Sequence, residues 1–306
     1  MRAVVTGGAG FIGSNVVDGL LDGGHDVVVV DDLSTGRREN LEPALAAGAA
    51  LLELDIRDGA ALARACAGAD VIFHLAAQID VRRSVADPRV DADINVGGTI
   101  AVLEAAREHD VGRVVFSSTG GALYGEADVF PTPEDAPIRA LSPYGQGKFA
   151  AEGYCGLYGR LHGVSSTVLR YSNVYGPRQD PLGEGGVISI FCGRSKAGER
   201  PTVFGDGRQT RDFVYVGDVV AANLRAAEAG VTGAFNIGTG VETSVLDLVG
   251  ALDRHAAGPW EAEFRPPRPG EVERSVLDPT RARDVLGWAP KVALQEGLER
   301  TLAAVA

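Results

Sequence analysis

The stretch Thr6-Gly7-Gly8-Ala9-Gly10-Phe11-Ile12-Gly13 decides the fold class of this 306-residue chain. It follows the apolar run 3–5 and opens a segment with helical spacing that extends towards Leu21. Glycines three positions apart at a strand-to-helix junction allow a tight turn, close approach of backbone N–H groups to a pyrophosphate, and close packing of helix on strand. The stretch therefore predicts a dinucleotide site formed by Gly7, Gly10, Phe11, Ile12 and Gly13.

The first half of the chain alternates short apolar runs with helix-like stretches. Successive runs lie roughly 20 to 40 residues apart, which leaves room for a crossover helix between them. This alternation predicts an α/β fold with a doubly wound parallel sheet of the Rossmann type. The expected buried strands are residues 3–5, 27–30, 50–54, 71–75 and 114–116.

The alternation weakens from about residue 171, where Gly, Pro and Arg become frequent. We therefore expect a dinucleotide-binding domain over residues 1–170 and a smaller lobe over residues 171–306. Residues 212–240 are expected to return to the first domain, with 213–216 and 234–237 as candidate strands of the main sheet.

Composition excludes several classes of protein. A net charge of −12 argues against a nucleic-acid binder, which would need clustered Lys and Arg. No apolar run reaches the length of roughly 18 residues needed to span a bilayer, and no basic segment precedes an apolar one at the N-terminus. We expect a cytoplasmic protein that does not bind membranes. Its three cysteines, Cys66, Cys155 and Cys192, fit neither a disulfide framework nor a metal site.

Polar and small residues follow the ends of the expected strands. A carboxylate at the end of the second strand can accept hydrogen bonds from ribose hydroxyls and repels a 2′-phosphate, so NAD is favoured over NADP. Later strand ends supply groups for the adenine and for the nicotinamide half. The candidates are Asp31 and Asp32 for the ribose, Asp55 and Ile56 for the adenine, and Leu75, Ala76 and Ala77 for the nicotinamide.

The segment Ser142-Pro143-Tyr144-Gly145-Gln146-Gly147-Lys148 predicts a catalytic helix. Ser142 is a suitable N-cap and Pro143 a suitable first residue, and a spacing of four places Tyr144 and Lys148 on one face. An ammonium beside a phenol favours the phenolate, so we expect Lys148 to lower the pKa of Tyr144 and make it a general base. Upstream, the apolar strand 114–116 ends in the hydroxyls of Ser117, Ser118 and Thr119, one of which could donate to the substrate.

Several motifs together resemble the extended short-chain dehydrogenases, and within them the UDP-glucose 4-epimerase group. They are the glycine stretch, residues 31–36, 74–78 and 95–99, the Tyr144 and Lys148 pair, and residues 170–178. The resemblance spans almost the whole chain. It implies that Tyr144, Lys148 and a hydroxyl residue 25 positions before the Tyr are catalytic, which selects Thr119 with Ser118 as the alternative. Further cofactor contacts are implied at Asn95, Ser117 and Tyr171.

The resemblance also implies that the second lobe binds a UDP-sugar. Two arginines suit the diphosphate because a guanidinium pairs with phosphate through two hydrogen bonds. A small residue at Ser275 suggests room for an N-acetyl group. The implied substrate-binding residues are Thr119, Asn173, Val187, Ile188, Thr202, Val203, Phe204, Arg211 and Arg268.

The residues after the strand-end hydroxyls indicate which reaction is expected. Related 4,6-dehydratases carry an Asp-Glu pair there, whereas this chain has Gly120 and Gly121. We therefore expect C4 epimerisation of UDP-glucose through a 4-keto sugar, with NAD staying bound. UDP-glucuronate remains an alternative substrate, for which Arg82, Arg83 or Arg178 could supply a cation, and a non-catalytic sensor remains an alternative function. A homodimer is implied through the helix after Asn95, with Val96, Ile100 and Leu103, and the helix bearing Tyr144.

Overall fold

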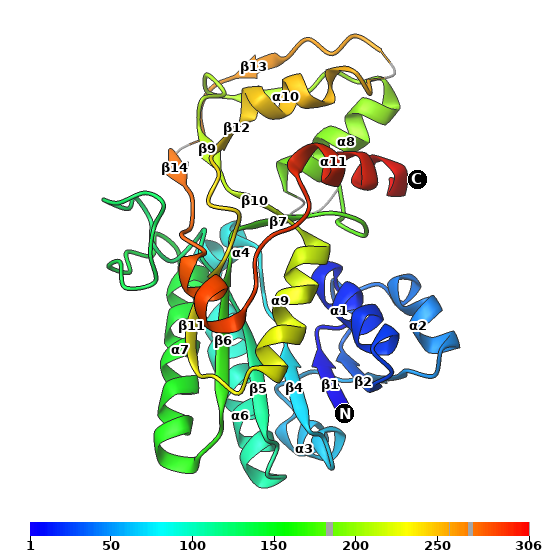
Figure 1. Ribbon diagram of the computed structural model, residues 1–306, viewed down its shortest axis with the longest axis vertical. Helices are drawn as coiled ribbons and strands as arrows, with labels where there is room; N and C mark the ends of the chain where they lie inside the picture. The colour runs from blue at the N-terminus through cyan, green and yellow to red at the C-terminus, as the bar shows by residue number, and fades with distance from the viewer. Residues whose placement is uncertain (182–185, 257, 269–271, 306) are drawn as a thin grey trace.

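The computed structural model describes residues 1–181, 186–256, 258–268 and 272–305. Seven parallel strands form its central sheet in the order β3-β2-β1-β4-β5-β6-β11 (Figure 1). The order runs outward from β1 in both directions, so the sheet is doubly wound, as the sequence predicts. The strands are β1 (Arg2–Thr6), β2 (Asp26–Asp31), β3 (Ala50–Glu53), β4 (Val71–His74), β5 (Arg113–Thr119), β6 (Ser166–Tyr171) and β11 (Gly233–Ile237).

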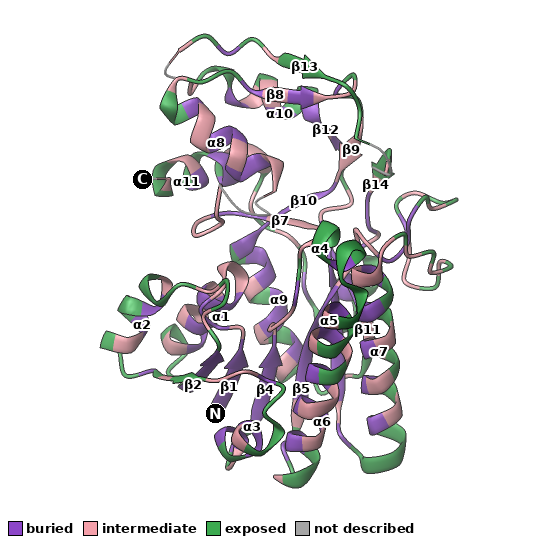
Figure 2. Cartoon of the chain, turned by 180° about the vertical axis from the view of Figure 1, so that it is seen from behind, coloured by how far each residue is buried: buried purple, intermediate pink, exposed green. Residues whose placement is uncertain are grey.

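Helices cover both faces of this sheet. The strands alternate between the two cores: Ala3 and Val5 of β1 lie in one, and Val4 lies in the other. Figure 2 shows the buried strands between helices whose outer sides are exposed. One face carries α1 (Phe11–Asp22), α2 (Glu42–Ala46) and α9 (Val216–Glu228), and the other carries α3 (Gly59–Cys66), α6 (Gly98–Glu108) and α7 (Pro143–His162).

Short helical segments complete this half of the chain. The ones that matter for the site, α4, α5 and η2, lie between β4 and α6 and contact α7. A π-helical turn such as η2 often marks a functional site. The segments are η1 (Arg38–Leu41), α4 (Val81–Ala86), α5 (Pro88–Ala92) and η2 (Asp93–Gly97).

Two strands differ from the expectations. The strand β6 was not expected, because Ser166, Thr167 and Arg170 interrupt its apolar run even though the whole strand is buried. Of the two segments expected to return to the main sheet, only 234–237 does so, as part of β11. The other segment forms β10 (Phe213–Tyr215), which pairs with β7 (Asn173–Tyr175) in a separate two-stranded sheet. That expectation is therefore wrong, because β7 and β10 lie beyond the carboxyl edge of the sheet, where they pair with each other.

The rest of the chain forms a smaller C-terminal lobe above that edge (Figure 1). Its own apolar core includes Phe191, Leu248, Trp260 and Leu298. No helix of the described residues is long and apolar enough to cross a membrane. The boundary between the two domains, expected between residues 170 and 171, stays a prediction. The lobe's elements are α8 (Val187–Ala197), α10 (Val245–Asp253), α11 (Leu294–Ala304), β8 (Thr202–Phe204), β9 (Thr210–Arg211), β12 (Thr243–Ser244), β13 (Glu263–Arg265) and β14 (Arg274–Ser275). The segment η3 (Ala282–Leu286) precedes α11 in the chain but packs against α9 and β11 of the central sheet.

Candidate active site

The three motif glycines have different physical roles. Gly7 has a φ of +70°, and a Cβ there would lie 2.5 Å from the backbone nitrogen of Ala76. A Cβ on Gly13 would lie 2.1 Å from the carbonyl oxygen of Gly7. At Gly10, the N-cap of α1, a Cβ would meet only that carbonyl oxygen, at 3.2 Å. Gly7 and Gly13 are thus required by chain packing, while Gly10 leaves the start of α1 open to a diphosphate.

The side chains of Phe11 and Ile12 are used in packing. Phe11 is packed against the core of the C-terminal lobe, and Ile12 against the core between the sheet and α1. Their predicted cofactor contacts are therefore limited to backbone N–H groups at the start of α1. These groups are unpaired at a helix N-terminus and favour an anion.

Asp31 ties the end of β2 to the glycine loop. Its Oδ2 accepts a hydrogen bond from the N–H of Ala9 at 2.8 Å, and its Oδ1 accepts one from Leu33 at 2.9 Å. Burial raises the pKa of Asp31, and these two hydrogen bonds oppose that shift. Each carboxylate oxygen retains a further lone pair that suits a ribose hydroxyl. Asp32 is exposed and accepts a hydrogen bond from the Ser34 hydroxyl at 2.6 Å.

The other predicted cofactor residues are placed along the same edge. Asp55 forms an ion pair with Arg57 at 2.5 Å, which holds the pKa of Asp55 below its usual value. Ile56 is buried. The N–H of Ala76, between Leu75 and Ala77, donates to Thr6 Oγ1 at 3.3 Å.

Asn95 is a buried link between η2 and the segment after β4. Its Oδ1 accepts a hydrogen bond from the N–H of Gln78 at 3.0 Å, and its Nδ2 donates to the Gln78 carbonyl at 2.9 Å. Both groups of its side-chain amide are thereby used inside the protein. The structure supports a role for Asn95 in fixing the backbone that follows Ala77.

The end of β5 and the start of α7 meet at the carboxyl edge of the sheet. The helix begins as predicted, with Pro143 first and Ser142 Oγ accepting the N–H of Gly145 at 3.2 Å. Tyr144 is hydrogen-bonded to the Thr119 side chain. Lys148 Nζ donates to the Ser117 carbonyl at 3.0 Å. We call Ser117–Thr119 and Tyr144–Lys148 together the catalytic edge.

The alternative hydroxyl, Ser118, is directed away from this group. Ser118 Oγ donates to Glu152 Oε1 at 2.5 Å, and Glu152 forms a buried ion pair with Arg170 at 2.7 Å. Neighbouring strand residues point to opposite faces, which is why Thr119 and Ser118 cannot both face the substrate. Ser118 is therefore not brought to Tyr144.

Ser117 and Tyr171 bond to each other inside the protein. Their hydroxyl oxygens are 2.9 Å apart, and the Tyr171 ring is buried in the core. The contact of these two residues with a cofactor stays a prediction.

Burial controls the ionisation of the catalytic edge. It raises the pKa of Tyr144 to about 12, opposed by the hydrogen bond to Thr119 and aided by the negative charge of Asp91. Burial also lowers the pKa of Lys148 to about 8, opposed by Asp91. The expectation that Lys148 lowers the pKa of Tyr144 is wrong for the polypeptide by itself, because desolvation of the phenolate prevails.

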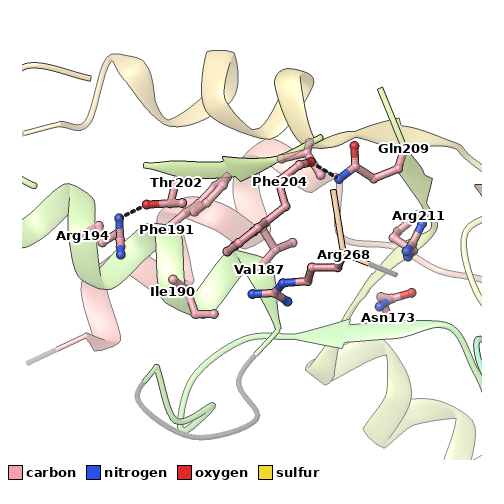
Figure 3. Close-up of a pocket in the computed structure, with 11 residues that line it drawn as sticks. Asn173, Val187, Ile190, Phe191, Arg194, Thr202, Phe204, Gln209, Arg211 and Arg268 are labelled. Carbon is pink, nitrogen blue, oxygen red and sulfur yellow. Dashed lines mark hydrogen bonds between the residues drawn. The ribbon is translucent and has the colours of Figure 1, made fainter. Parts of the chain in front are cut away.

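A cavity of about 350 Å³ lies in the C-terminal lobe (Figure 3). Six of the predicted substrate residues line it, whereas Ile188 and Val203 do not and are buried in the core of the lobe. The lining residues that were predicted are Asn173, Val187, Thr202, Phe204, Arg211 and Arg268.

The periodicity of the elements explains which residues reach this cavity. Thr202 and Phe204 of β8 face it while Val203 between them faces the core, as expected for a strand. Along α8, the lining positions are spaced by three or four residues from Val187. The helical period from Val187 predicts Ile190, Phe191 and Arg194, which were not among the expected residues. The lining residues missed in total are Ile190, Phe191, Arg194, Gln209 and Val245.

The cavity is polar at both ends, and one of its residues lies close to the segment that follows β5. Figure 3 shows Arg194 and Thr202 at one end, joined by a hydrogen bond of 2.6 Å, and Arg211 and Asn173 at the other. A Cβ on Gly121, two residues after Thr119, would lie 3.7 Å from Asn173 Oδ1. Asn173 therefore lies both in the cavity wall and close to the segment that follows Thr119.

Arg268 covers the middle of the cavity. Its guanidinium lies 3.9 Å from the centre of the Phe204 ring, a stacking contact that leaves its N–H groups available for phosphate. Residues 269–271 of its motif lie outside the described residues.

The residues expected to affect substrate choice do not line the cavity. Ser275 of β14 is paired in register with Arg211 of β9, so it sits beside a cavity residue. Arg178 is paired with Asp18 of α1 at 2.6 Å. Arg82 and Arg83 lie on α4 and are exposed.

A doubly wound sheet with a glycine loop, and a Thr, Tyr and Lys group at the same edge, define an enzyme that binds a dinucleotide. The chain belongs to the NAD dependent epimerase/dehydratase family, whose model matches residues 3–238.

Three relatives are similar over almost their whole length. The UDP-glucose 4-epimerase of Mycolicibacterium smegmatis is 51% identical over 306 residues, which is 99% of this chain and 97% of that protein. The crystal structure of the Thermotoga maritima UDP-glucose 4-epimerase with UDP-glucose is 48% identical, with a TM-score of 0.96 and coverage of 99% and 98%. That of the Thermus thermophilus enzyme with NAD is 42% identical, with a TM-score of 0.92 and coverage of 100% and 99%.

Proposed function

We propose that this protein inverts C4 of a UDP-sugar, interconverting UDP-glucose and UDP-galactose, with NAD as a retained cofactor. The observation that carries the proposal is the catalytic edge: Tyr144 is hydrogen-bonded to Thr119, with Lys148 on the same helix face. Relatives of 42 to 51% identity bear the name UDP-glucose 4-epimerase.

Tyr144 is the proposed general base and acid. Its phenolic oxygen and the Thr119 hydroxyl form the pair that holds the proton of the sugar 4-hydroxyl. Thr119 orients that hydroxyl, and Tyr144 takes and returns the proton. Lys148 holds a positive charge near the phenol and is fixed by the Ser117 carbonyl.

The residues of the glycine loop fit NAD. The open start of α1 at Gly10 would bind the diphosphate, and the Asp31 carboxylate would accept the ribose hydroxyls. When bound, NAD would accept hydride from C4 and return it, and its positive ring would favour the phenolate. Burial of the site opposes the phenolate, so the positive charge of bound NAD would help Tyr144 to act as a base.

The cavity is the proposed UDP site. The end of the cavity with Thr202, Phe204 and Arg194 suits the uracil base. Arg268 and Arg211 suit the diphosphate. Asn173 lies between the cavity and the catalytic edge, where it can bind the sugar. This arrangement anchors the nucleotide while the sugar turns over above Tyr144.

Dehydration is disfavoured by packing at the end of β5. A Cβ on Gly120 would lie 2.4 Å from a methyl carbon of Leu277, whose side chain is buried. An acidic side chain at this position would therefore need Leu277 to move. This supports simple epimerisation over loss of water.

The finer properties extend the proposal. Ser275, beside Arg211, leaves UDP-GlcNAc as a second substrate. UDP-glucuronate is less suited, because Arg178, one candidate cation, is paired with Asp18.

We further propose a cytoplasmic homodimer in which Val96 and Ile100, both half-buried, contact the second subunit. Leu103 does not contribute, because it is fully buried in its own subunit.

An NMR time course with UDP-glucose, UDP-GlcNAc and UDP-glucuronate in separate tubes, without added cofactor, tests the function. We expect UDP-galactose to appear from UDP-glucose, and no epimer to appear with Tyr144→Phe. A 4-keto-6-deoxy product would contradict epimerisation, and silence in every tube would contradict it too, once the protein is shown to contain NAD.

A further inference from the structure

Asp91 on α5 is a buried carboxylate that the proposed reaction does not use. Its relative exposure is 2%, although an uncompensated buried charge is strongly unfavourable. Asp91 Oδ1 accepts hydrogen bonds from Gln78 Nε2 at 2.8 Å and from Asn95 Nδ2 at 3.0 Å. These neutral amides satisfy one oxygen without neutralising the charge.

The second oxygen of Asp91 lies against the catalytic helix. A Cβ on Gly147 would lie 3.1 Å from Asp91 Oδ2, so glycine at this position lets the carboxylate approach α7 closely. Gly147 is three residues after Tyr144 and directly before Lys148, on the side of α7 that faces α5. Figure 2 shows α5 beside the start of α7. The approach to Gly147 therefore places the carboxylate beside the turn of helix that carries both catalytic side chains.

Asp91 differs from the other titratable groups near Lys148. Glu152 is already paired with Arg170 at 2.7 Å. His74 is neutral, with burial lowering its pKa to about 3. The titratable or charged groups that face Lys148 are Tyr144, Glu152 and Cys155 from α7, His74 from β4 and Asp91 from α5, with exposed Arg82 and Arg83 on α4, which packs against α7.

We propose that Asp91 is a positioning residue for the catalytic edge, the buried counter-charge that keeps Lys148 protonated during the reaction. The proposal rests on the proposed function of Lys148 as the cation beside Tyr144. Among the described residues, no hydrogen bond joins Asp91 to either side chain, so its charge acts through space across the contact between α5 and α7. The same carboxylate fixes the backbone at Gln78 through Oδ1.

The variant Asp91→Asn separates charge from shape, because its amide oxygen can still accept the two hydrogen bonds. Asp91 opposes the effect of burial on Lys148 and adds to the effect of burial on Tyr144. Removing its charge therefore lowers the pKa of both groups. We expect both limbs of the pH profile of kcat to move to lower pH by about one unit, with KM for the UDP-sugar unchanged.

The lysine content allows a test that does not depend on activity. The chain has only three lysines, Lys148, Lys196 and Lys291, so ¹³C-lysine labelling gives three side-chain signals to titrate by NMR. We expect the Lys148 signal to titrate near pH 8 in the wild type and lower in Asp91→Asn, with the other two unchanged. Asp93→Asn, an exposed carboxylate two residues away, is the matched control and should shift nothing.

Each outcome decides the proposal. An unchanged Lys148 titration in Asp91→Asn, or a fall in kcat by the same factor at every pH, would overturn it and leave a structural role. Asp91→Ser, which keeps an acceptor without the charge, replaces the first variant if that one does not fold. If the wild type does not epimerise UDP-sugars, the proposed function fails, while the titration still tests the electrostatic role of Asp91.

Discussion

The catalytic edge and the cavity are built by different means. Tyr144 and Lys148 come from one turn of α7, and Thr119 comes from the adjacent strand end. The cavity draws its walls from α8, β8, β9 and the segment at Arg268, whose order in the chain says little about their proximity. A site on one regular element is determined by local spacing, whereas a site between elements depends on which face each element presents.

Their stabilising interactions differ as well. Behind the catalytic edge lie buried polar groups with assigned partners, such as Glu152 with Arg170 and Asn95 with Gln78. The cavity is instead backed by an apolar core that includes Phe191 and Trp260. Changes at the edge should therefore affect chemistry, and changes at the cavity should affect binding.

The largest expected effect is that of Tyr144→Phe. Removing the hydroxyl takes away the proton acceptor and leaves the ring, so kcat should fall by about a thousandfold. UDP binding in the cavity should stay within a factor of about two of the wild type, because Tyr144 does not line it. Initial rates and calorimetric titration with UDP measure the two quantities, and an equal loss in both would break the distinction between the regions.

The next largest effect is expected at low pH, where the central sheet should lose stability before the C-terminal lobe. His74 is hydrogen-bonded to Thr6 at 2.8 Å and to Thr99 at 3.0 Å, and burial lowers its pKa from 6.5 to about 3. Between these pH values the unfolded chain binds a proton at His74 and the folded chain does not, so stability falls as the pH is lowered through this range. Asp212, beside the lobe, has a raised pKa and acts in the opposite direction.

Hydrogen exchange at pH 7 and pH 4.5 checks this. We expect peptides from β1 and β4 to lose protection before peptides from α8 and α10, and His74→Gln to reduce that difference. Equal loss across both regions at the lower pH would show that His74 does not control the acid response.

The variant Arg268→Ala tests whether the cavity binds the diphosphate through a positive charge. Replacing it with alanine removes a cation from the proposed diphosphate site and the stacking on Phe204, so KM for UDP-glucose should rise by roughly tenfold with little change in kcat. Arg265→Ala is the matched control, since Arg265 is exposed and does not line the cavity. A loss of kcat at constant KM would instead place Arg268 in the chemistry.

The same distinction explains what could be predicted from sequence. The glycine loop and the catalytic helix were found because their residues are close together in the sequence, and the helix start at Ser142 followed from capping rules. The strand β6 was missed because burial of Arg170 depends on Glu152, a partner 18 residues away. The resemblance already selected Thr119, with Ser118 as the alternative, and the structure adds the physical reason: the strand's orientation directs Ser118 to Glu152 and not to Tyr144.

The smallest effects should come from two valines that were both expected to line the cavity. Val187 does line it, while Val203 is fully buried in the core beside it. Val187→Ala should raise KM by about threefold through lost apolar contact and leave the melting temperature almost unchanged. Val203→Ala, the same chemical change, should leave KM unchanged and lower the stability by about 2 kcal/mol because it opens a void in the core. Thermal melts and initial rates on the pair measure both, and identical behaviour of the two variants would mean that the alternation along β8 does not define the cavity wall.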